Sequence, residues 1–194
     1  MKRLCVFCGS SAGGQPGYAE AAREFGGLLA RQGLGLVYGG GHVGLMGVLA
    51  DAVLGGGGEV IGVIPQALVE REMAHPGLTE LRVVGTMHQR KALMADLADG
   101  FAALPGGYGT GDELFEILTW AQLGLHTRPI GLLNTAGYFD ALLAWLDQMV
   151  REQFLWPEHR RLLLTADSPA ALLQLLLQPP PAEPVGKWIT PADR

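Results

Sequence analysis

Long apolar runs, clusters of basic residues and paired cysteines are scarce in this chain of 194 residues. No apolar run approaches the roughly 20 residues that a membrane-spanning helix requires, so we expect no membrane partner. Lysine and arginine occur in no run longer than a pair, and the formal net charge is −5, which argues against nucleic acid as a partner. The first residues turn small and glycine-rich too soon to form a signal peptide, and we expect a cytoplasmic protein.

The two cysteines, Cys5 and Cys8, have the C-x-x-C spacing found in some redox and zinc sites. Both fall in a predicted strand rather than at a helix N-terminus, and no second Cys/His pair completes a zinc site. We expect them to be small buried side chains.

Lysine occurs only three times, which limits the chemistry available to the chain. A pyridoxal-phosphate enzyme needs a lysine for its Schiff base, and Lys91 is the only candidate. It stands beside Arg90 in a predicted helix, with no separate pyridine-binding features, so we expect no such cofactor. The five histidines show no metal-ligand spacing, and no P-loop is present. We predict no metal site and no kinase or ATPase activity.

Glycine, in contrast, is abundant: 29 glycines gather in short loops between apolar segments. Apolar runs alternate with segments of helical periodicity along the chain. Strands are predicted at 4–8, 34–38, 59–65, 81–84, 101–104, 129–133 and 162–165, and helices at 18–32, 45–54, 87–98, from the 105–113 motif to 123, and at 138–151 and 169–177. This alternation predicts an α/β fold with a doubly wound, mostly parallel sheet and helices on both faces.

Glycine loops follow three of the predicted strands, at 9–14, 39–44 and 106–111. In such sheets, ligands bind beyond the carboxyl ends of the strands. The 39–44 loop fits G-x-G-x-x-G, but it follows the second strand rather than the first. Glu59, about 15 residues after its last glycine, begins a strand, so the pattern is weak evidence for a dinucleotide site. A nucleoside monophosphate, which needs a single phosphate cradle, fits three short loops as well.

The segment Pro105-Gly106-Gly107-Tyr108-Gly109-Thr110-Gly111-Asp112-Glu113 joins an apolar strand to an amphipathic helix. Its glycines expose backbone N–H groups, and the helix directs its positive end to the same place, an arrangement typical of phosphate binding. Two carboxylates at its end need another explanation. Thr110 and Glu113 have the spacing of a capping box, so Glu113 is either a helix cap or a functional carboxylate beside the phosphate.

A catalytic interpretation of Glu113 requires a compensating positive charge, which Arg90 and Lys91 on the preceding helix supply. A carboxylate and an arginine beside a sugar phosphate suit cleavage at the anomeric carbon, where the transition state resembles an oxocarbenium ion. The carboxylate stabilises that cation or activates water, and the arginine orients the carboxylate. Glu116, one turn further on, faces either the same cleft or solvent. Glu72, in an irregular segment, either contacts the ligand or is solvated.

Several motifs resemble those of one family, the LOG ("Lonely Guy") proteins, which are cytokinin riboside 5′-monophosphate phosphoribohydrolases. The resemblance covers roughly residues 4–155. The motifs that carry it, in the family's order, are Cys8-Gly9-Ser10-Ser11, Tyr38-Gly39-Gly40-Gly41, Gly44-Leu45-Met46-Gly47, Met87-His88-Gln89-Arg90-Lys91, the P-G-G-x-G-T-x-x-E segment at 105–113, and Thr119-Trp120-Ala121-Gln122-Leu123-Gly124. One departure is Asp112, where many members have Glu, which shortens the side chain but keeps the charge.

The resemblance implies a Rossmann-like homodimer without cofactor that hydrolyses the N-glycosidic bond of N6-modified adenosine 5′-monophosphates, or of AMP, to free base and ribose 5-phosphate. Apart from the resemblance, the length of the chain and the Pro179-Pro180-Pro181 run predict a single nucleotide-binding domain at 1–178 and a proline-rich tail at 179–194. The implied catalytic pair is Arg90 and Glu113. The implied nucleotide-binding residues are Glu72, Arg90, Lys91, Gly107, Tyr108, Gly109, Thr110, Gly111, Asp112, Glu113 and Thr119, with Ser10 and the Gly40-Gly41 loop lining the cleft. A non-catalytic nucleotide-binding or carrier protein of the same fold is the alternative.

Overall fold

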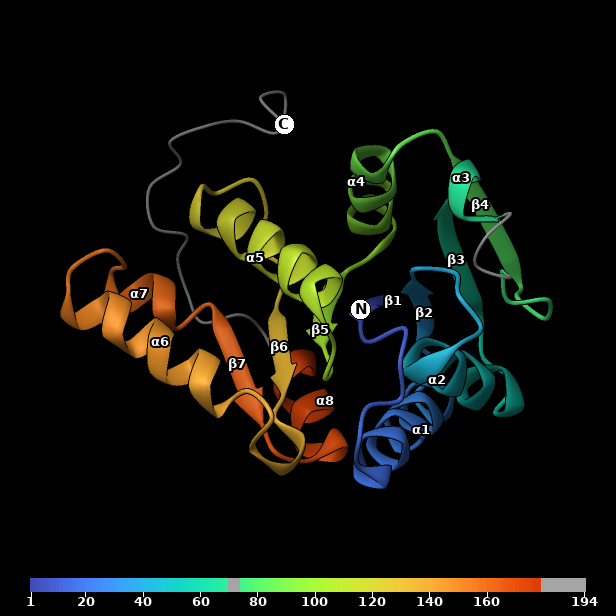
Figure 1. Cartoon of the computed structure of the whole chain (residues 1–194), viewed down its shortest axis with the longest axis horizontal. Coiled ribbons are helices and arrows are strands. Elements are labelled where there is room, and N and C mark those ends of the chain that lie inside the picture. The colour runs from blue at the N-terminus through green and yellow to red at the C-terminus, as the bar shows by residue number, and fades with distance from the viewer. Residues whose placement is uncertain (70–73, 179–194) are drawn as a thin grey trace.

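Short strands assemble into one seven-stranded parallel sheet in residues 1–69 and 74–178, which the computed structural model describes (Figure 1). The strands are β1 (Arg3–Phe7), β2 (Gly35–Tyr38), β3 (Val60–Pro65), β4 (Glu80–Val84), β5 (Gly100–Ala103), β6 (Ile130–Leu133) and β7 (Leu163–Ala166). Their order across the sheet is β4-β3-β2-β1-β5-β6-β7. All seven predicted strands are confirmed to within two residues, and so is the α/β fold class.

Helices connect the strands: α1 (Pro16–Arg31), α2 (Gly44–Gly55), α3 (Gln66–Val69), α4 (Met87–Leu97), α5 (Tyr108–Gln122), α6 (Asp140–Arg151), α7 (Pro157–Arg160), α8 (Pro169–Leu177) and the 3-10 turn η1 (Thr135–Gly137). The short elements α3, η1 and α7 were not predicted, because three or four residues carry too little periodicity. Within the described ranges, no helix is long and apolar enough to cross a membrane. The predicted tail at 179–194 lies outside the described residues.

Apolar side chains on both faces of the strands create two separate cores. Successive strand residues point to opposite faces, so Leu4 and Val6 of β1 pack in one core and Cys5 and Phe7 in the other. The first core is covered by α1, α2 and α8, and the second by α4, α5 and α6 (Figure 1). Cys5 and Cys8 are buried free thiols, and burial raises the pKa of both, as expected of structural cysteines.

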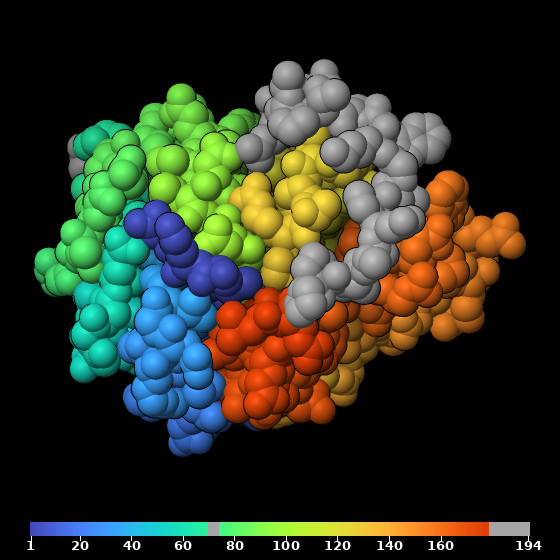
Figure 2. Space-filling view, turned by 180° about the vertical axis from the view of Figure 1, so that it is seen from behind, coloured from blue at the N-terminus to red at the C-terminus, as the bar shows by residue number. Residues whose placement is uncertain are grey.

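Helix α8 closes the first core at the back of the molecule, where it lies beside α1 (Figure 2). It spans the predicted range, with Pro169 at its first position, and the Ser168 hydroxyl caps it by accepting a hydrogen bond from the Ala171 N–H at 3.4 Å. Helix α1 ends at Arg31, and Gly33 just beyond it has a φ of +65° that allows the Leu34 N–H to reach the Leu29 carbonyl at 2.9 Å.

The strand order reverses its direction of growth next to β1. From β1 the chain first extends the sheet through β2 and β3 to β4, and it then returns to place β5 on the other side of β1. The loops at the carboxyl ends of β1 and β5 therefore diverge to opposite faces, which opens the crevice where such sheets bind ligands. Two of the three predicted glycine loops begin there, and the third follows the adjacent β2.

We expect Gly44→Ala to lower the free energy of unfolding by about 1–3 kcal/mol. Gly44 has a φ of +63°, and a Cβ there would lie 2.3 Å from the carbonyl carbon of Ser10. The matched control is Gly55→Ala at the end of α2, where a Cβ meets nothing within 4 Å and the stability should stay within about 0.5 kcal/mol. Urea unfolding of the three proteins measures both effects, and equal stabilities would contradict the close packing of the loops.

Candidate active site

The three glycine loops meet at the carboxyl edge of the sheet. The Gly9 N–H donates to the Pro105 carbonyl at 3.0 Å, which joins the first loop to the third. The Met46 N–H donates to the Gly9 carbonyl at 3.3 Å, which joins the first loop to the second. The close approach of Gly44 to Ser10 completes this arrangement. Ser10 and the 105–111 segment, both predicted to line the cleft, therefore lie on adjoining loops.

Helix α5 begins earlier than the sequence suggested, and of the two alternatives left open for Glu113, the capping box with Thr110 is wrong. The N-cap is Gly107, the first helical residue is Tyr108, and no side chain caps this helix within the described residues. Thr110 and Glu113 are buried residues within α5 and do not stand at its start. The T-x-x-E pattern here therefore lies in the body of the helix. The first-turn N–H groups, on Tyr108, Gly109 and Thr110, have no carbonyl partner inside the helix and are available to an anion.

The glycines of the third loop differ in what surrounds them. A Cβ on Gly106 would lie 2.1 Å from the Thr110 hydroxyl and 2.9 Å from the Gly9 nitrogen, so this glycine is required by packing. A Cβ on Gly107, Gly109 or Gly111 would meet nothing within 4 Å. Because residues two apart do not share a helix face, these three glycines leave the start of the helix open on more than one side, and a ligand can approach it closely.

A capping box does exist at α4, where the sequence reading missed it. The Thr86 hydroxyl accepts from the Gln89 N–H at 3.1 Å, and the Gln89 side-chain carbonyl accepts from the Thr86 N–H at 3.2 Å. The same carbonyl accepts from the Gly85 N–H at 2.9 Å. The T-x-x-Q pattern was visible in the sequence. This cap fixes the first turn of α4, which carries Arg90 and Lys91.

Two backbone carbonyls hold the Arg90 guanidinium in place by accepting hydrogen bonds from it. Its Nε donates to the Val63 carbonyl of β3 at 3.1 Å, and its Nη2 donates to the Gly39 carbonyl at 3.4 Å. A Cβ on Gly39 would lie 2.0 Å from Nη2, so only glycine admits the guanidinium there. Its Nη1 lies 3.5 Å from Oε1 of Glu113. The structure thus brings the predicted pair together. Gly39 lies in the glycine loop predicted at 39–44, but neither its contact with Arg90 nor that of Val63 was predicted.

Glu113 is a buried carboxylate, with 8% of its surface exposed. Burial raises the pKa of Glu113 to about 7; Asp112 and Glu116 add to the rise, while Arg90 and Lys91 oppose it. The desolvation of the carboxylate therefore exceeds the attraction of the nearby cations. A carboxyl group with a pKa near neutrality exchanges protons readily at physiological pH, which suits acid–base chemistry.

Lys91 joins α4 to α5 through two carboxylates. Its Nζ lies 3.0 Å from Oδ2 of Asp112 and 3.1 Å from Oε1 of Glu116. Burial lowers the pKa of Lys91, but the two ion pairs outweigh it and the net shift is upward. A lysine that forms Schiff bases needs the opposite shift. Glu116 therefore faces the cleft side of α5 rather than solvent alone.

The remaining predicted residues are placed differently. Tyr108 is fully exposed at the start of α5. Thr119, almost two turns beyond Glu113, donates its hydroxyl to the Phe115 carbonyl at 2.7 Å and lies on an exposed part of the helix. Glu72 lies outside the described residues. The chain resumes beside the second loop, where the His75 N–H donates to the Gly40 carbonyl at 3.0 Å. The nucleotide-binding roles of Glu72 and Thr119 stay predictions.

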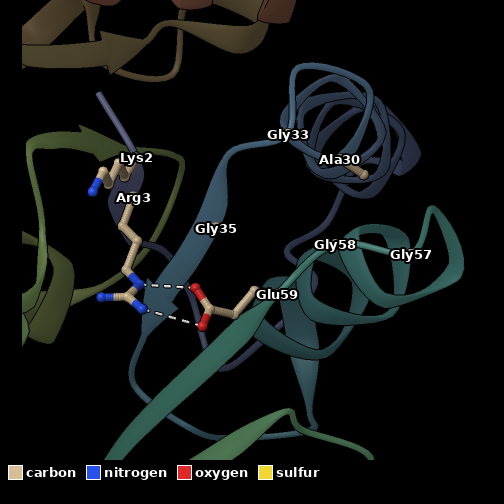
Figure 3. Close-up of a pocket in the computed structure, with 8 residues that line it drawn as sticks. All are labelled: Lys2, Arg3, Ala30, Gly33, Gly35, Gly57, Gly58 and Glu59. Atoms are coloured by element: carbon tan, nitrogen blue, oxygen red, sulfur yellow. Dashed lines mark hydrogen bonds and ion pairs between the residues drawn. The ribbon is translucent and has the colours of Figure 1, made fainter.

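A cavity of about 490 Å³ lies at the opposite edge of the sheet (Figure 3). It is lined by the starts of β1, β2 and β3, and mainly by glycines. Arg3 closes one side by a bidentate ion pair with Glu59, with Nε–Oε2 and Nη2–Oε1 distances of 2.8 and 3.2 Å. Parallel sheets bind ligands at the carboxyl ends of their strands, and none of the predicted site residues lies here, so we assign no catalytic role to this cavity. Across the described ranges, no group of three or more His, Cys, Asp or Glu side chains could hold a metal ion.

Comparison with known proteins identifies the family. The family described as "Possible lysine decarboxylase" matches residues 46–176. The chain is 50% identical over 192 residues to the probable cytokinin riboside 5′-monophosphate phosphoribohydrolase LOGL5 of Oryza sativa subsp. japonica, covering 98% of this chain and 78% of that protein. It is 51% identical over 176 residues to the cytokinin riboside 5′-monophosphate phosphoribohydrolase LOG1 of Arabidopsis thaliana, covering 91% and 83%. The chain belongs to the LOG family.

Solved structures with lower identity confirm the Rossmann-like fold of this LOG-family chain. A molybdenum cofactor binding protein from Rippkaea orientalis has a TM-score of 0.68 at 21% identity, covering 90% of this chain and 95% of that one. The molybdenum cofactor carrier protein of Chlamydomonas reinhardtii has a TM-score of 0.68 at 22% identity, covering 91% and 98%. At this identity the likeness concerns the fold alone.

We expect the stability of Glu113→Gln, relative to the wild type, to rise between pH 5 and pH 8. The folded wild type holds its carboxyl proton more tightly than the unfolded chain. This tighter proton binding therefore stabilises the folded wild type fully below pH 4.5, and the stabilisation is lost as the pH rises through about 7. This shift corresponds to at most about 3 kcal/mol, and glutamine has no charge to acquire. Urea unfolding at several pH values measures the difference, with the exposed Glu24→Gln as control. A pH-independent difference would contradict the burial-driven shift.

Proposed function

We propose that this protein hydrolyses the N-glycosidic bond of adenosine 5′-monophosphates, with cytokinin riboside 5′-monophosphates as the substrate class that its relatives' names indicate. The observation that carries the proposal is the buried Arg90–Glu113 pair, which lies next to a helix N-terminus with open glycines. The products would be the free base and ribose 5-phosphate.

In this proposal, the start of α5 binds the phosphate group of the substrate. Backbone N–H groups from Gly107 to Thr110 would hold the phosphate oxygens, supported by the positive end of the 15-residue helix. Lys91 already forms ion pairs with Asp112 and Glu116. In this proposal it links α4 to α5 and offsets part of the negative charge near the ligand.

The chemical step falls to Glu113 and Arg90. Hydrolysis breaks the bond between the anomeric carbon and the base nitrogen, adds the oxygen of water to that carbon and gives one proton of the water to the departing base. Ionised Glu113 would stabilise the positive charge on the sugar or accept a proton from the water. Arg90 would orient the carboxylate and balance its charge in a site largely removed from water.

We expect Glu113→Gln to reduce kcat/KM by about 10²–10⁴-fold on AMP and on N6-isopentenyladenosine 5′-monophosphate. In the wild type, kcat/KM should fall about tenfold per pH unit below pH 7 and level off above it, because the active carboxylate acquires a proton there. Release of free base, followed by chromatography, measures both. Near-full activity of Glu113→Gln would refute the catalytic role, and a rate that declines above pH 7 would show that the protonated form acts instead.

A non-catalytic carrier is the second candidate, favoured only by the fold shared with molybdenum cofactor carriers. A carrier has no need of a carboxylate with a raised pKa paired to an arginine. Incubation of the protein with the two nucleotides separates the candidates, since a carrier binds nucleotide without releasing base. The lysine decarboxylase description is disfavoured by the raised pKa of Lys91.

We also propose that the protein forms a homodimer through the face built by α5, α6 and α7. Large apolar side chains lie exposed there: Phe154 is 86% exposed, Trp156 51% and Trp145 50%. They border a groove of about 200 Å³ that is lined by Phe115, Leu118, Leu146, Met149 and Leu155. An aromatic patch of this kind is typical of protein–protein interfaces.

A cytoplasmic location accords with two buried cysteines that remain free thiols.

We expect Phe154→Glu to convert the dimer to a monomer, because a carboxylate at the centre of an apolar interface would lose its hydration. The control is Val83→Glu, at an exposed apolar position of the edge strand β4, which should leave the dimer intact. Size-exclusion chromatography with light scattering measures the mass of each. A wild-type monomer at micromolar concentration, or a dimeric Phe154→Glu protein, would contradict the proposed interface.

A further inference from the structure

Tyr138 makes a contact with the phosphate-binding loop that the proposed roles leave unexplained. It lies between β6 and α6, and its hydroxyl donates a hydrogen bond to the Gly106 carbonyl at 2.6 Å, across 32 residues of sequence. The tyrosine is 43% exposed, so burial of its ring does not account for it. The hydroxyl is the part of the side chain that reaches the loop.

The carbonyl that Tyr138 holds belongs to a peptide group at the centre of the anion site. The Gly106 carbonyl and the Gly107 N–H share one trans peptide plane, and they point in opposite directions. Both neighbours of this peptide are glycines, which leave its orientation free unless a contact fixes it. A hydrogen bond to the carbonyl therefore also sets the direction of the Gly107 N–H, at a residue where a Cβ would meet nothing within 4 Å.

The turn that presents Tyr138 is itself tightly held. The buried Asn134 side chain donates to Oδ1 of Asp140 at 2.8 Å and accepts from the Phe139 N–H at 2.7 Å. Between them, Ala136 and Gly137 both adopt left-handed conformations, with φ of 53° and 71°. Such a conformation is unfavourable for alanine and persists where the surrounding contacts determine it. A strained turn that places one hydroxyl against one carbonyl is typical of a positioning device.

Aromatic neighbours fix the ring of Tyr138 as well. Its ring lies edge-on to that of Tyr18, with centroids 5.5 Å apart, and edge-on to that of Phe139, with centroids 4.8 Å apart. These contacts restrict the rotation of the ring, so the hydroxyl has little freedom to leave the carbonyl. Removal of the hydroxyl alone would leave this cluster intact.

We propose that Tyr138 is a positioning residue for the phosphate group of the substrate, acting through the Gly106–Gly107 peptide. This inference rests on the proposed function, because it assigns the phosphomonoester to the start of α5. The hydroxyl holds the Gly107 N–H toward the phosphate oxygens, and without it the peptide samples other orientations and the phosphate loses one oriented donor.

The test compares the wild type with Tyr138→Phe, and uses Tyr18→Phe as the matched control that removes a hydroxyl from the same aromatic cluster. Calorimetry measures the binding of ribose 5-phosphate and of adenine, and steady-state assays measure KM and kcat on AMP. For Tyr138→Phe we expect about three- to tenfold weaker ribose 5-phosphate binding and a similar rise in KM. Adenine affinity and kcat should change less than about twofold, and Tyr18→Phe should resemble the wild type.

Each contrary outcome has a separate meaning. Unchanged ribose 5-phosphate binding in Tyr138→Phe would overturn the positioning role while leaving the proposed function intact. Equal weakening of adenine and ribose 5-phosphate, or a matching loss in Tyr18→Phe, would show a general loosening of the fold and also overturn it. A wild type that hydrolyses no nucleotide and binds no ribose 5-phosphate would overturn the proposed function together with this inference. Thermal unfolding of all three proteins confirms that the folded states are compared.

Discussion

The contact between the Arg90 guanidinium and the Glu113 carboxylate is the interaction on which the rest of the cleft depends. Removal of a carboxylate from water is costly unless a partner and hydrogen bonds compensate for it. The partner must reach the centre of the sheet edge from a separate helix. The capping box at Thr86 fixes the start of that helix, the Val63 carbonyl receives the guanidinium, and the absence of a side chain at Gly39 leaves room for it.

The charges around this pair explain why the proposed phosphate site relies on backbone groups rather than on basic side chains. Two cations, Arg90 and Lys91, face three carboxylates on α5, at Asp112, Glu113 and Glu116. Both cations are already paired within the protein, so a phosphate brings further negative charge to a cluster that is negative overall. Backbone N–H groups and a helix dipole attract the anion without another charged side chain. Open glycines allow it to come close.

Periodicity in the sequence was sufficient to predict the strands, the long helices and the α/β class, because two-faced burial leaves a clear pattern in each element. It did not give the strand order, which depends on contacts between distant residues. The capping alternative at Thr110 is wrong and the capping box at Thr86 was not predicted, since local spacing alone cannot tell an N-cap from an interior turn. A glycine N-cap, as at Gly107, leaves no side chain to recognise.

The candidate site could likewise be predicted only in part from the sequence. The proximity of Arg90 to Glu113 followed from placing them on successive helices at one sheet edge, and the geometry agrees with it. The supporting carbonyls of Val63 and Gly39, and the hydroxyl of Tyr138, carry no signature in sequence because they act through backbone groups or across long separations.

The open surroundings of Gly107, Gly109 and Gly111 set them apart from Gly39, Gly44 and Gly106, whose neighbours leave no room for another atom. Among the described residues, no neighbour requires glycine at the first three positions, so in the proposed site a methyl group there would obstruct the ligand without disturbing the fold. A mutational scan scored for abundance and another scored for turnover would thus diverge at these three sites and coincide at the other three. Some glycines of these loops are thus required by the packing of the fold, and others by the binding of the ligand.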